Sequence, residues 1–178
     1  MNLDSAQSNI TNNTHYKDLR SEISSYLAEH NSMVLATVGG DKPWAAAVFY
    51  VHDRSFNLYF LSEDSTRHSS HILTNGRVAA TVNEDPDDWK KIRGIQLEGT
   101  ASKVTSAVEK AKVLALYLRK FPFVRSFLIS QDRLLTRMVI GGKAVSFSIY
   151  RLKPERVFYL DNRKGFSHRE ELRLGAKN

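Results

Sequence analysis

The chain contains no cysteine among its 178 residues. Disulfide bonds, thiolate nucleophiles, and zinc or iron–sulfur sites that need cysteine ligands are therefore excluded from the intact chain. Any redox chemistry would have to be supplied by a bound cofactor.

Leader sequences and long apolar runs are also lacking. The first residues, MNLDSAQSNITNNT, contain neither a basic leader nor an apolar stretch. No apolar run approaches the roughly 20 residues that a membrane-spanning helix needs. We therefore expect a cytoplasmic protein without contact with a membrane. At this length one sizeable core is expected, with residues 1–14 as a flexible tail and residues 15–178 as a single domain.

Motifs that would identify an enzyme class are missing as well. The chain has no G-x-S-x-G elbow, no P-loop and no G-x-G-x-x-G fingerprint. His68 and His71 lie at a spacing compatible with metal binding, but no third ligand accompanies them, so no metal site is predicted. Nothing pairs Asp87, Asp88 or Glu98 into a general acid and base, so no catalytic residue is assigned.

Positive charge is concentrated in the second half of the chain. Residues 1–102 contain 9 Lys and Arg against 13 Asp and Glu, whereas residues 103–178 contain 17 against 6. Such a surface can bind nucleic acid, but it is equally typical of a solvated face or of a pocket for a phosphorylated small molecule. Because no basic motif with interleaved aromatic residues is present, the solvated face is favoured and nucleic-acid binding is not expected.

The first part of the chain changes from a helical to a β-type pattern. Apolar residues at helical spacing predict an amphipathic helix over residues 15–30. Short β-rich runs follow, separated by the turn sequences GGDK and DRS, and they predict antiparallel strands near residues 33–38, 44–52 and 57–62. Further strands are expected over residues 77–84 and 92–104, where Gly94 and Gly99 predict bends or bulges.

Two more helices and two closing strands complete the pattern. Ser106 and Glu109 form a capping box before a helix over residues 106–121, whose apolar stripe consists of Val108, Ala111, Ala115 and Leu118. Short helical pieces are expected over residues 123–135, a turn at residues 141–142, and strands at residues 144–150 and 157–160. Six or seven mainly antiparallel strands with peripheral helices indicate an α+β protein built on a small barrel.

The segment that could carry chemistry is Leu58 to His68, LYFLSEDSTRH, where a strand enters a helix. Ser65 offers an N-cap for a short helix over residues 66–74, which Asn75-Gly76 would end through a left-handed residue. The first turn of a helix has free N–H donors and a positive dipole end, and a guanidinium can bind a phosphate through two hydrogen bonds. An anion site and an ordinary capped helix with a solvated Arg67 are both compatible with this pattern.

The chain resembles the pyridoxamine 5'-phosphate oxidase-like, FMN-binding split-barrel superfamily, and most closely its YhbP-like bacterial group. The resemblance covers residues 16 to about 170. It depends on the segments SEDSTRH, VAATVNEDPDDWKKIRGIQLEGTA, LRKFPFVRSF and YRLKPERVFYLDNRKGF, which occur in the order and spacing of that family.

The resemblance implies a split β-barrel that binds FMN and forms a homodimer, with the cofactor at the subunit interface. It assigns the FMN phosphate to Ser62, Thr66, Arg67 and His68, and it places the flavin ring along the second strand near Ala46, Ala47 and Val48. The protein would then be a flavin-dependent oxidoreductase acting on an unknown small molecule.

Departures from the oxidase leave a second reading open. Where the oxidase has an arginine and a lysine on the second strand, this chain has Ala45 and Tyr50. Where it has a second basic phosphate ligand, this chain has His68, and where it has a flavin-contacting glutamine, this chain has Gly94. Oxidation of vitamin B6 is therefore not expected. The alternative is a flavin- or haem-binding module for storage, sensing or stress response, and His168 is the position that the haem version of this alternative would use.

Overall fold

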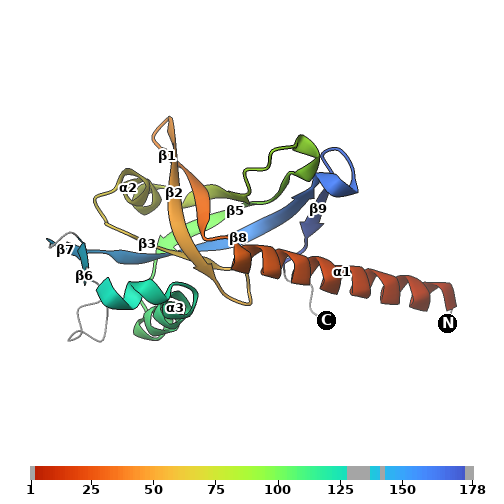
Figure 1. Ribbon diagram of the computed structural model, residues 1–178, viewed down its shortest axis with the longest axis horizontal. Helices are drawn as coiled ribbons and strands as arrows, with labels where there is room; N and C mark the ends of the chain where they lie inside the picture. Colours follow the sequence, from red (N-terminus) through yellow and green to blue (C-terminus); the bar gives the residue numbers. More distant parts are fainter. Residues whose placement is uncertain (1–2, 128–136, 141–142, 175–178) are drawn as a thin grey trace.

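Six antiparallel strands close into a barrel in the computed structural model, which describes residues 3–127, 137–140 and 143–174 (Figure 1). The strands are β1 (Ser32–Gly39), β2 (Lys42–His52), β3 (Leu58–Ser62), β4 (Arg77–Asn83), β5 (Arg93–Lys103) and β8 (Ser148–Asp161). They are ordered β3-β2-β1-β4-β5-β8, and the pairing of β3 with β8 closes the circle. The predicted α+β split barrel is confirmed.

Strand β8 explains why the barrel is split. It pairs with β5 along its length, whereas its other edge pairs first with β3, at residues 148–152, and then with β9 (Arg169–Leu172), at residues 157–160. Strands β3 and β9 therefore pair with successive segments of the same edge of β8. The prediction of a separate strand at residues 157–160 is therefore wrong, because these residues continue the 14-residue strand β8.

A bulge lets β5 bend around the barrel. The register between β5 and β8 shifts between Glu98 and Gly99. A Cβ atom on Gly99 would lie 2.2 Å from the carbonyl oxygen of Lys153, so only glycine permits this approach of the two backbones. The predicted bulge at Gly99 is confirmed, whereas the register passes through Gly94 without a shift.

The barrel interior is filled by aromatic and aliphatic side chains that alternate along the strands. In β1, Met33 and Leu35 point inward while Val34 and Ala36 point outward. Large side chains buried in this core include Tyr50, Phe60 and Tyr150 from the strands, together with Ile23 and Leu27 from the first helix.

Helix α1 (Leu3–Glu29) covers one end of this core and extends away from the barrel at its amino-terminal side (Figure 1). Its buried residues are Leu19, Ile23, Tyr26 and Leu27. The helix begins at Leu3, earlier than the expected residue 15; the division of the chain into a tail and a domain at residue 14 stays a prediction. Lys120 donates hydrogen bonds to the carbonyl oxygens of Leu27 (3.0 Å) and His30 (2.6 Å), which satisfies groups that the end of α1 leaves unpaired.

Helix α3 (Ala107–Lys120) lies outside the barrel against β2 and β3, and Ser106 caps it as predicted. It buries Val113 and Tyr117, and the Tyr117 hydroxyl donates to the backbone carbonyls of Phe49 (2.9 Å) and Tyr59 (3.2 Å). These bonds fix the rotation of the helix, so the predicted apolar stripe does not face the core: Val108 is 82% exposed.

The remaining elements are short. Helix α2 (Arg67–Thr74) follows β3, the strands β6 (Arg137–Ile140) and β7 (Lys143–Ser146) form a separate hairpin, and 3₁₀ turns η1 (Trp89–Lys91), η2 (Pro122–Phe127) and η3 (Asn162–Lys164) connect the larger elements. The expected turn at residues 141–142 and most of the helical pieces expected over residues 123–135 lie outside the described residues. Among the described helices, none is both long and apolar enough to cross a membrane.

Candidate functional site

The junction between β3 and α2 places four polar side chains around one point. The hydroxyl oxygen of Ser62 lies 2.9 Å from that of Thr66 and 2.8 Å from Nε2 of His68. Ser69 contributes a third hydroxyl, 3.0 Å from Ser62 and 2.8 Å from Thr66. Three of the residues assigned to the phosphate are thus in direct contact, while Ser69 was missed because its place inside the cluster depends on the turn of the helix.

Helix α2 begins one residue later than expected. Thr66, not Ser65, is its N-cap, and the Thr66 side chain makes no capping hydrogen bond because it is engaged in the hydroxyl cluster. The prediction for Ser65 is therefore wrong. The predicted left-handed end is also wrong, since Asn75 has an extended backbone with φ of −141°.

The junction carries charges of both signs: Arg67 is the cation at the start of α2, and Glu63 and Asp64 are carboxylates just before it. Arg67 is exposed and makes no ion pair within the described part of the chain; its guanidinium carbon lies 4.5 Å from the centre of the Trp44 ring. Burial, with a smaller contribution from neighbouring His71, lowers the pKa of His68, which is therefore neutral at pH 7. The hydrogen bond from Lys103 is the main reason why the pKa of nearby Asp64 falls to about 2, so this carboxylate is already matched by a cation.

Beside the junction, one edge of β2 is open. The pairing of β2 with β3 ends at Tyr50 and Phe60, so among the described strands residues 42–49 pair only with β1. On this open stretch Ala46 and Val48 are half-buried on the inner face, whereas Ala47 is exposed on the outer face. Because α2 packs on β1 and β2, and Arg67 stacks on Trp44, the open edge and the hydroxyl cluster belong to one region.

Three of the positions that differ from the oxidase are Tyr50, Ala45 and Gly94, and the structure shows what surrounds each of them. The Tyr50 side chain is fully buried and its hydroxyl donates to the carbonyl oxygen of Leu27 at 2.9 Å. Ala45 lies on the exposed outer face of β2. A Cβ atom on Gly94 would lie 3.1 Å from the carbonyl oxygen of Val82, so a side chain there requires a small shift of the backbone.

Of the other sequence candidates, His71 lies on α2 in this region, whereas no contact brings His168 or Trp89 to it. His71 Nδ1 lies 3.0 Å from the Thr37 hydroxyl, and His168 Nε2 lies 2.9 Å from a carboxylate oxygen of Glu170. Trp89 packs edge-to-face on Phe166, with ring centres 5.4 Å apart. These histidines and this tryptophan therefore have local partners of their own.

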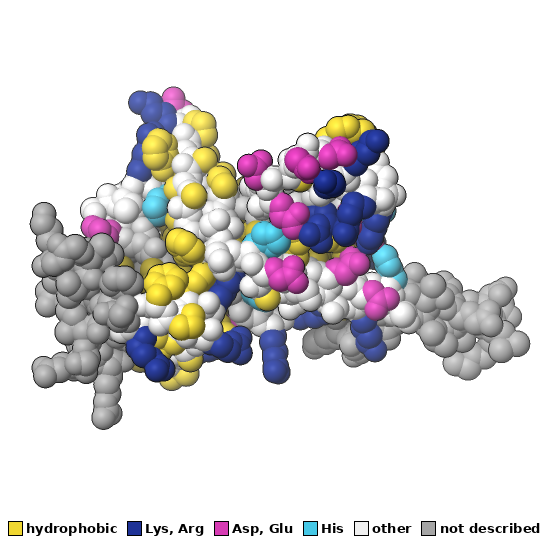
Figure 2. Space-filling view, in the orientation of Figure 1, with side chains coloured by type: hydrophobic (Ala, Val, Ile, Leu, Met, Phe, Trp, Pro, Cys, Tyr) yellow, Lys and Arg dark blue, Asp and Glu magenta, His cyan; other side chains and the backbone are white. Residues whose placement is uncertain are grey.

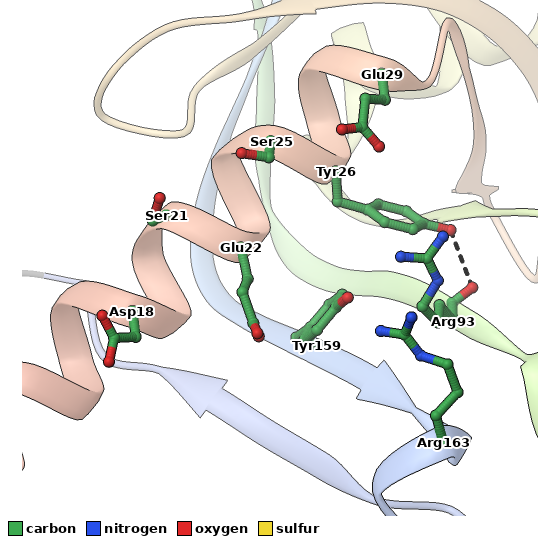
Figure 3. Close-up of a pocket in the computed structure, with 9 residues that line it drawn as sticks. All are labelled: Asp18, Ser21, Glu22, Ser25, Tyr26, Glu29, Arg93, Tyr159 and Arg163. Atoms are coloured by element: carbon green, nitrogen blue, oxygen red, sulfur yellow. Dashed lines mark hydrogen bonds between the residues drawn. The ribbon is translucent and has the colours of Figure 1, made fainter.

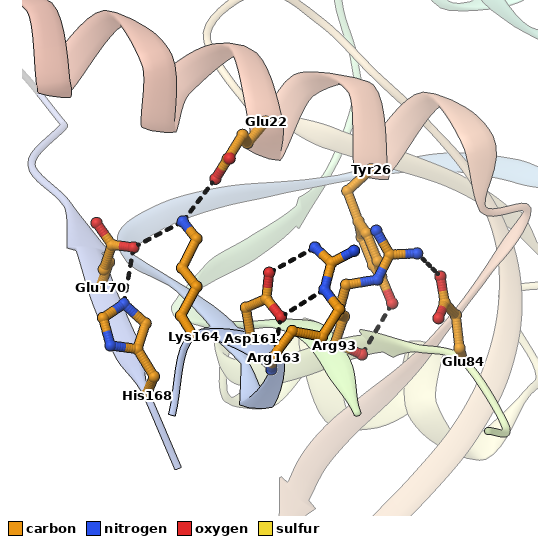
Figure 4. Close-up of polar contacts among 9 residues, drawn as sticks. All are labelled: Glu22, Tyr26, Glu84, Arg93, Asp161, Arg163, Lys164, His168 and Glu170. Carbon is orange, nitrogen blue, oxygen red and sulfur yellow. Dashed lines mark hydrogen bonds and ion pairs between the residues drawn. The ribbon is translucent and has the colours of Figure 1, made fainter. Parts of the chain in front are cut away.

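Much of the positive charge in the second half of the chain is paired with carboxylates. Arg156 contacts Glu171 at 2.9 Å, and Arg151 contacts Glu109 at 2.9 Å. Lys164 lies between Glu170 and Glu22, at 3.1 and 3.2 Å (Figure 4). This pairing agrees with a solvated, salt-bridged face.

A cavity that the sequence did not predict lies between α1 and the end of the barrel (Figure 3). Its volume is about 400 Å³, and two arginines, Arg93 and Arg163, point into it opposite the carboxylates of α1. None of the residues assigned to FMN lines it. Sequence reasoning had no signal for this site, because its lining residues come from α1, β5, β8 and η3, more than 140 positions apart at the extremes.

The fold and the polar junction define a protein of the split β-barrel class. The model of one family, described as pyridoxamine 5'-phosphate oxidase, matches residues 19–161, and the chain belongs to this family. Within it, the chain is similar to the YhbP-like proteins, as the resemblance in its sequence motifs predicted.

Two of these relatives are bacterial UPF0306 proteins. The one from Klebsiella pneumoniae subsp. pneumoniae is 27% identical over 160 residues, which cover 89% of this chain and 96% of the relative. The YhbP protein of Salmonella paratyphi C is 32% identical over 109 residues, which cover 61% of this chain and 74% of the relative.

A solved structure with a similar fold is the heme binding protein of Mycobacterium smegmatis. It superposes with a TM-score of 0.65 at 18% identity, covering 85% of this chain and 56% of that protein. At this identity the similarity concerns the fold alone.

Proposed function

We propose that the protein binds FMN, with the phosphate at the β3–α2 junction and the flavin ring along the open edge of β2. The observation that supports this most strongly is the convergence of Ser62, Thr66 and His68 at the start of α2, next to an arginine that no described carboxylate pairs with. Hydroxyls, backbone N–H groups and a guanidinium are the donors that phosphate groups use in proteins.

The residues at the junction fit a phosphate, but with less charge than the family's oxidase supplies. Arg67 is the permanent cation at the start of α2, and His68 is neutral unless the bound anion raises its pKa. The absence of a cation at Ala45 and Tyr50 also leaves less positive charge for FMN than the oxidase supplies. We therefore expect FMN to bind more weakly than in the oxidase and to be lost more easily during purification.

The open edge of β2 suits the flavin ring. The backbone groups of residues 42–48 that face away from β1 have no strand partner among the described strands, so they can bond to the edge of a ring. The short side chains of Ala46 and Ala47 permit a close approach, and Val48 would contact the ring from the inner face. When bound, FMN supplies the hydride or electron transfer, while these residues hold and orient it.

The cofactor site would be completed in a cytoplasmic homodimer. The outer face of the β1–β2 hairpin is apolar and exposed, and Figure 2 shows hydrophobic side chains along this hairpin. The residues of this face are Val34, Ala36 and Val38 from β1, and Ala45, Ala47 and Phe49 from β2. A contiguous apolar face of this kind marks a protein interface more often than a solvated surface. Self-association through it would place the ring between two subunits.

Titration of the purified protein with FMN tests the proposal. We expect flavin fluorescence to change on binding, and the dissociation constant to increase in Arg67→Ala but not in Arg54→Ala, an exposed arginine at the β2–β3 turn. Equal affinities in the two variants, or no binding of FMN by the native protein, would contradict it. Reduction of the bound flavin by candidate electron donors then separates an oxidoreductase of unknown substrate from a module that only binds flavin.

A haem-binding or haem-storage module is the second candidate, because similar folds include the heme binding protein of Mycobacterium smegmatis. His168 was the residue considered as a haem ligand. In the structure its Nε2 contacts Glu170, which also contacts Lys164 and His15, so this nitrogen would have to leave a salt-bridge network (Figure 4). Titration with haemin distinguishes the candidates: a Soret shift that His168→Ala abolishes would favour haem over FMN.

A further inference from the structure

The cavity beside α1 has two walls of opposite charge. The barrel side contributes Arg93 and Arg163, whose guanidinium groups both point toward the helix (Figure 3). The helix side contributes Asp18, Glu22 and Glu29, which share one face of α1. Acidic and basic side chains also lie side by side on this face of the molecule in Figure 2. The volume of about 400 Å³ lies within the range of small-molecule sites.

The arginines are held from behind by carboxylates of the barrel. Asp161, which is 1% exposed, accepts from Nε and Nη2 of Arg163 at 2.8 and 2.6 Å. Glu84 accepts from Nη2 of Arg93 at 2.6 Å (Figure 4). These contacts fix the direction of both guanidinium groups. They also leave Nη1 of Arg163 without a partner among the described residues.

The carboxylates of the helix wall also form few ion pairs within the described chain, so they can bind a ligand. Asp18 and Glu29 make no ion pair with any described residue, and Glu22 contacts only Lys164, at 3.2 Å. No ion pair of the described chain joins these three carboxylates to Arg93 or Arg163. Opposite charges therefore face each other across the cavity without neutralising one another.

This arrangement selects a ligand by its charges. An anion would be attracted by the arginines but repelled by the carboxylates of α1. A cation would be attracted by these carboxylates but repelled by the arginines. A molecule with an ammonium group at one end and a carboxylate at the other gains on both walls. Tyr26 and Tyr159, packed edge-to-face with ring centres 5.9 Å apart, offer an apolar surface for the methylene groups between the two ends.

We infer that this cavity binds a small zwitterion, with its carboxylate at Arg93 and Arg163 and its ammonium group at the carboxylates of α1. The ligand class is an ω-amino acid or a molecule with the same separation of charges. The site shares no residue with the β3–α2 junction. It therefore does not depend on whether the protein binds FMN.

Calorimetric titration at low ionic strength tests this inference, because salt screens exposed charges. The probe is 6-aminohexanoate, and the matched controls are hexanoate and hexylamine, each of which carries one of the two charges. We expect both controls to bind at least about tenfold more weakly than 6-aminohexanoate, because each of them loses one charge-assisted contact. Hexylamine or hexanoate binding as tightly as 6-aminohexanoate would overturn the inference. So would the failure of every ω-amino acid of about three to eight carbons to bind at millimolar concentration.

Variants assign the binding to the cavity. Glu29→Gln removes an exposed carboxylate that has no ion-pair partner among the described residues, so the fold should be unaffected, and the affinity for 6-aminohexanoate should fall about tenfold. Arg163→Lys should weaken binding similarly, because lysine keeps the charge but loses the fork of N–H donors. Asp41→Asn, in the β1–β2 turn, changes the net charge equally and should leave binding unchanged. Unchanged affinity in Glu29→Gln would overturn the inference.

Discussion

Arg67 at the start of α2 and Arg163 beside α1 are both substantially exposed, yet their surroundings are opposite. Arg163 is held by the buried carboxylate of Asp161 through two hydrogen bonds. Arg67 has no carboxylate partner among the described residues and lies over the Trp44 ring. A paired arginine has part of its charge compensated and offers a ligand only its remaining N–H donors, whereas an arginine without a carboxylate partner offers all of them.

This difference shows how two arginine sites of one barrel can serve different ligands. At the α2 junction the Arg67 guanidinium and the helix N-terminus favour an anion. In the cavity beside α1 each arginine already has a carboxylate, and three more line the opposite wall. A phosphate suits the first environment, and a zwitterion suits the second. Four predictions test the comparison.

Replacing the unpaired arginine should have the largest effect on binding. Arg67→Ala removes a charge-assisted contact of about 1.5–3 kcal/mol, so the dissociation constant for FMN should rise roughly 10- to 150-fold. Its free energy of unfolding should stay within about 0.5 kcal/mol of the native value, because Arg67 forms no ion pair with the described residues. Fluorescence titration and urea unfolding measure the two quantities. A large loss of stability without a loss of FMN affinity would reverse the roles that we assign to the two arginines.

Breaking the paired site should instead affect stability. Asp161→Asn leaves the Arg163 guanidinium without its carboxylate and should lower the free energy of unfolding by about 1–3 kcal/mol. The hydrogen bonds from Arg163 lower the pKa of Asp161, so this stabilisation is present above the usual value of 3.8 and is lost as the pH falls below it. Urea unfolding at pH 7 and at acidic pH should therefore show a difference between the proteins that shrinks with acidification. A constant difference would argue against the ion pair as its source.

Trp44 should influence FMN binding through Arg67. The cation–π contact at 4.5 Å holds the guanidinium beside the start of α2. Such a contact contributes about 0.5–1 kcal/mol at an exposed site, so Trp44→Leu should weaken FMN binding roughly two- to fivefold. In the Arg67→Ala background the same substitution should have no further effect. Additive losses in the double variant would indicate that Trp44 contacts the flavin itself.

The smallest expected effect is the pH dependence contributed by His68. Burial holds its pKa below the usual 6.5 in the free protein, and a bound phosphate would favour the protonated ring. FMN affinity should therefore increase by roughly two- to threefold as the pH falls from 8 toward 6. His68→Gln should remove this increment, leaving only the titration of the phosphate itself. Identical pH profiles for the two proteins would mean that His68 does not contact the anion.

Local patterns sufficed for most of the barrel. The alternation of Met33 and Leu35 with exposed neighbours, the turn residues Gly39-Gly40, and Gly99 in a long strand predicted elements close to those observed. The sequence also predicted helix α3, but the prediction of its buried face was wrong. The hydrogen bonds of Tyr117 to β2 and β3 decide the rotation of this helix. Such contacts join residues more than 50 positions apart and leave no periodic signal.

The sequence by itself determined the strand pattern, the absence of thiol chemistry, and the concentration of Ser62, Thr66, Arg67 and His68 at a strand-to-helix junction, since neighbours in the chain remain neighbours in space. Only the tertiary structure decided what surrounds each charge. Asp161 and Arg163 are two positions apart and pair locally, but the fold places this pair and Arg93 opposite the carboxylates of α1, and it places Arg67 over the Trp44 ring. The electrostatic surroundings of each site therefore depend on long-range contacts that no local pattern encodes.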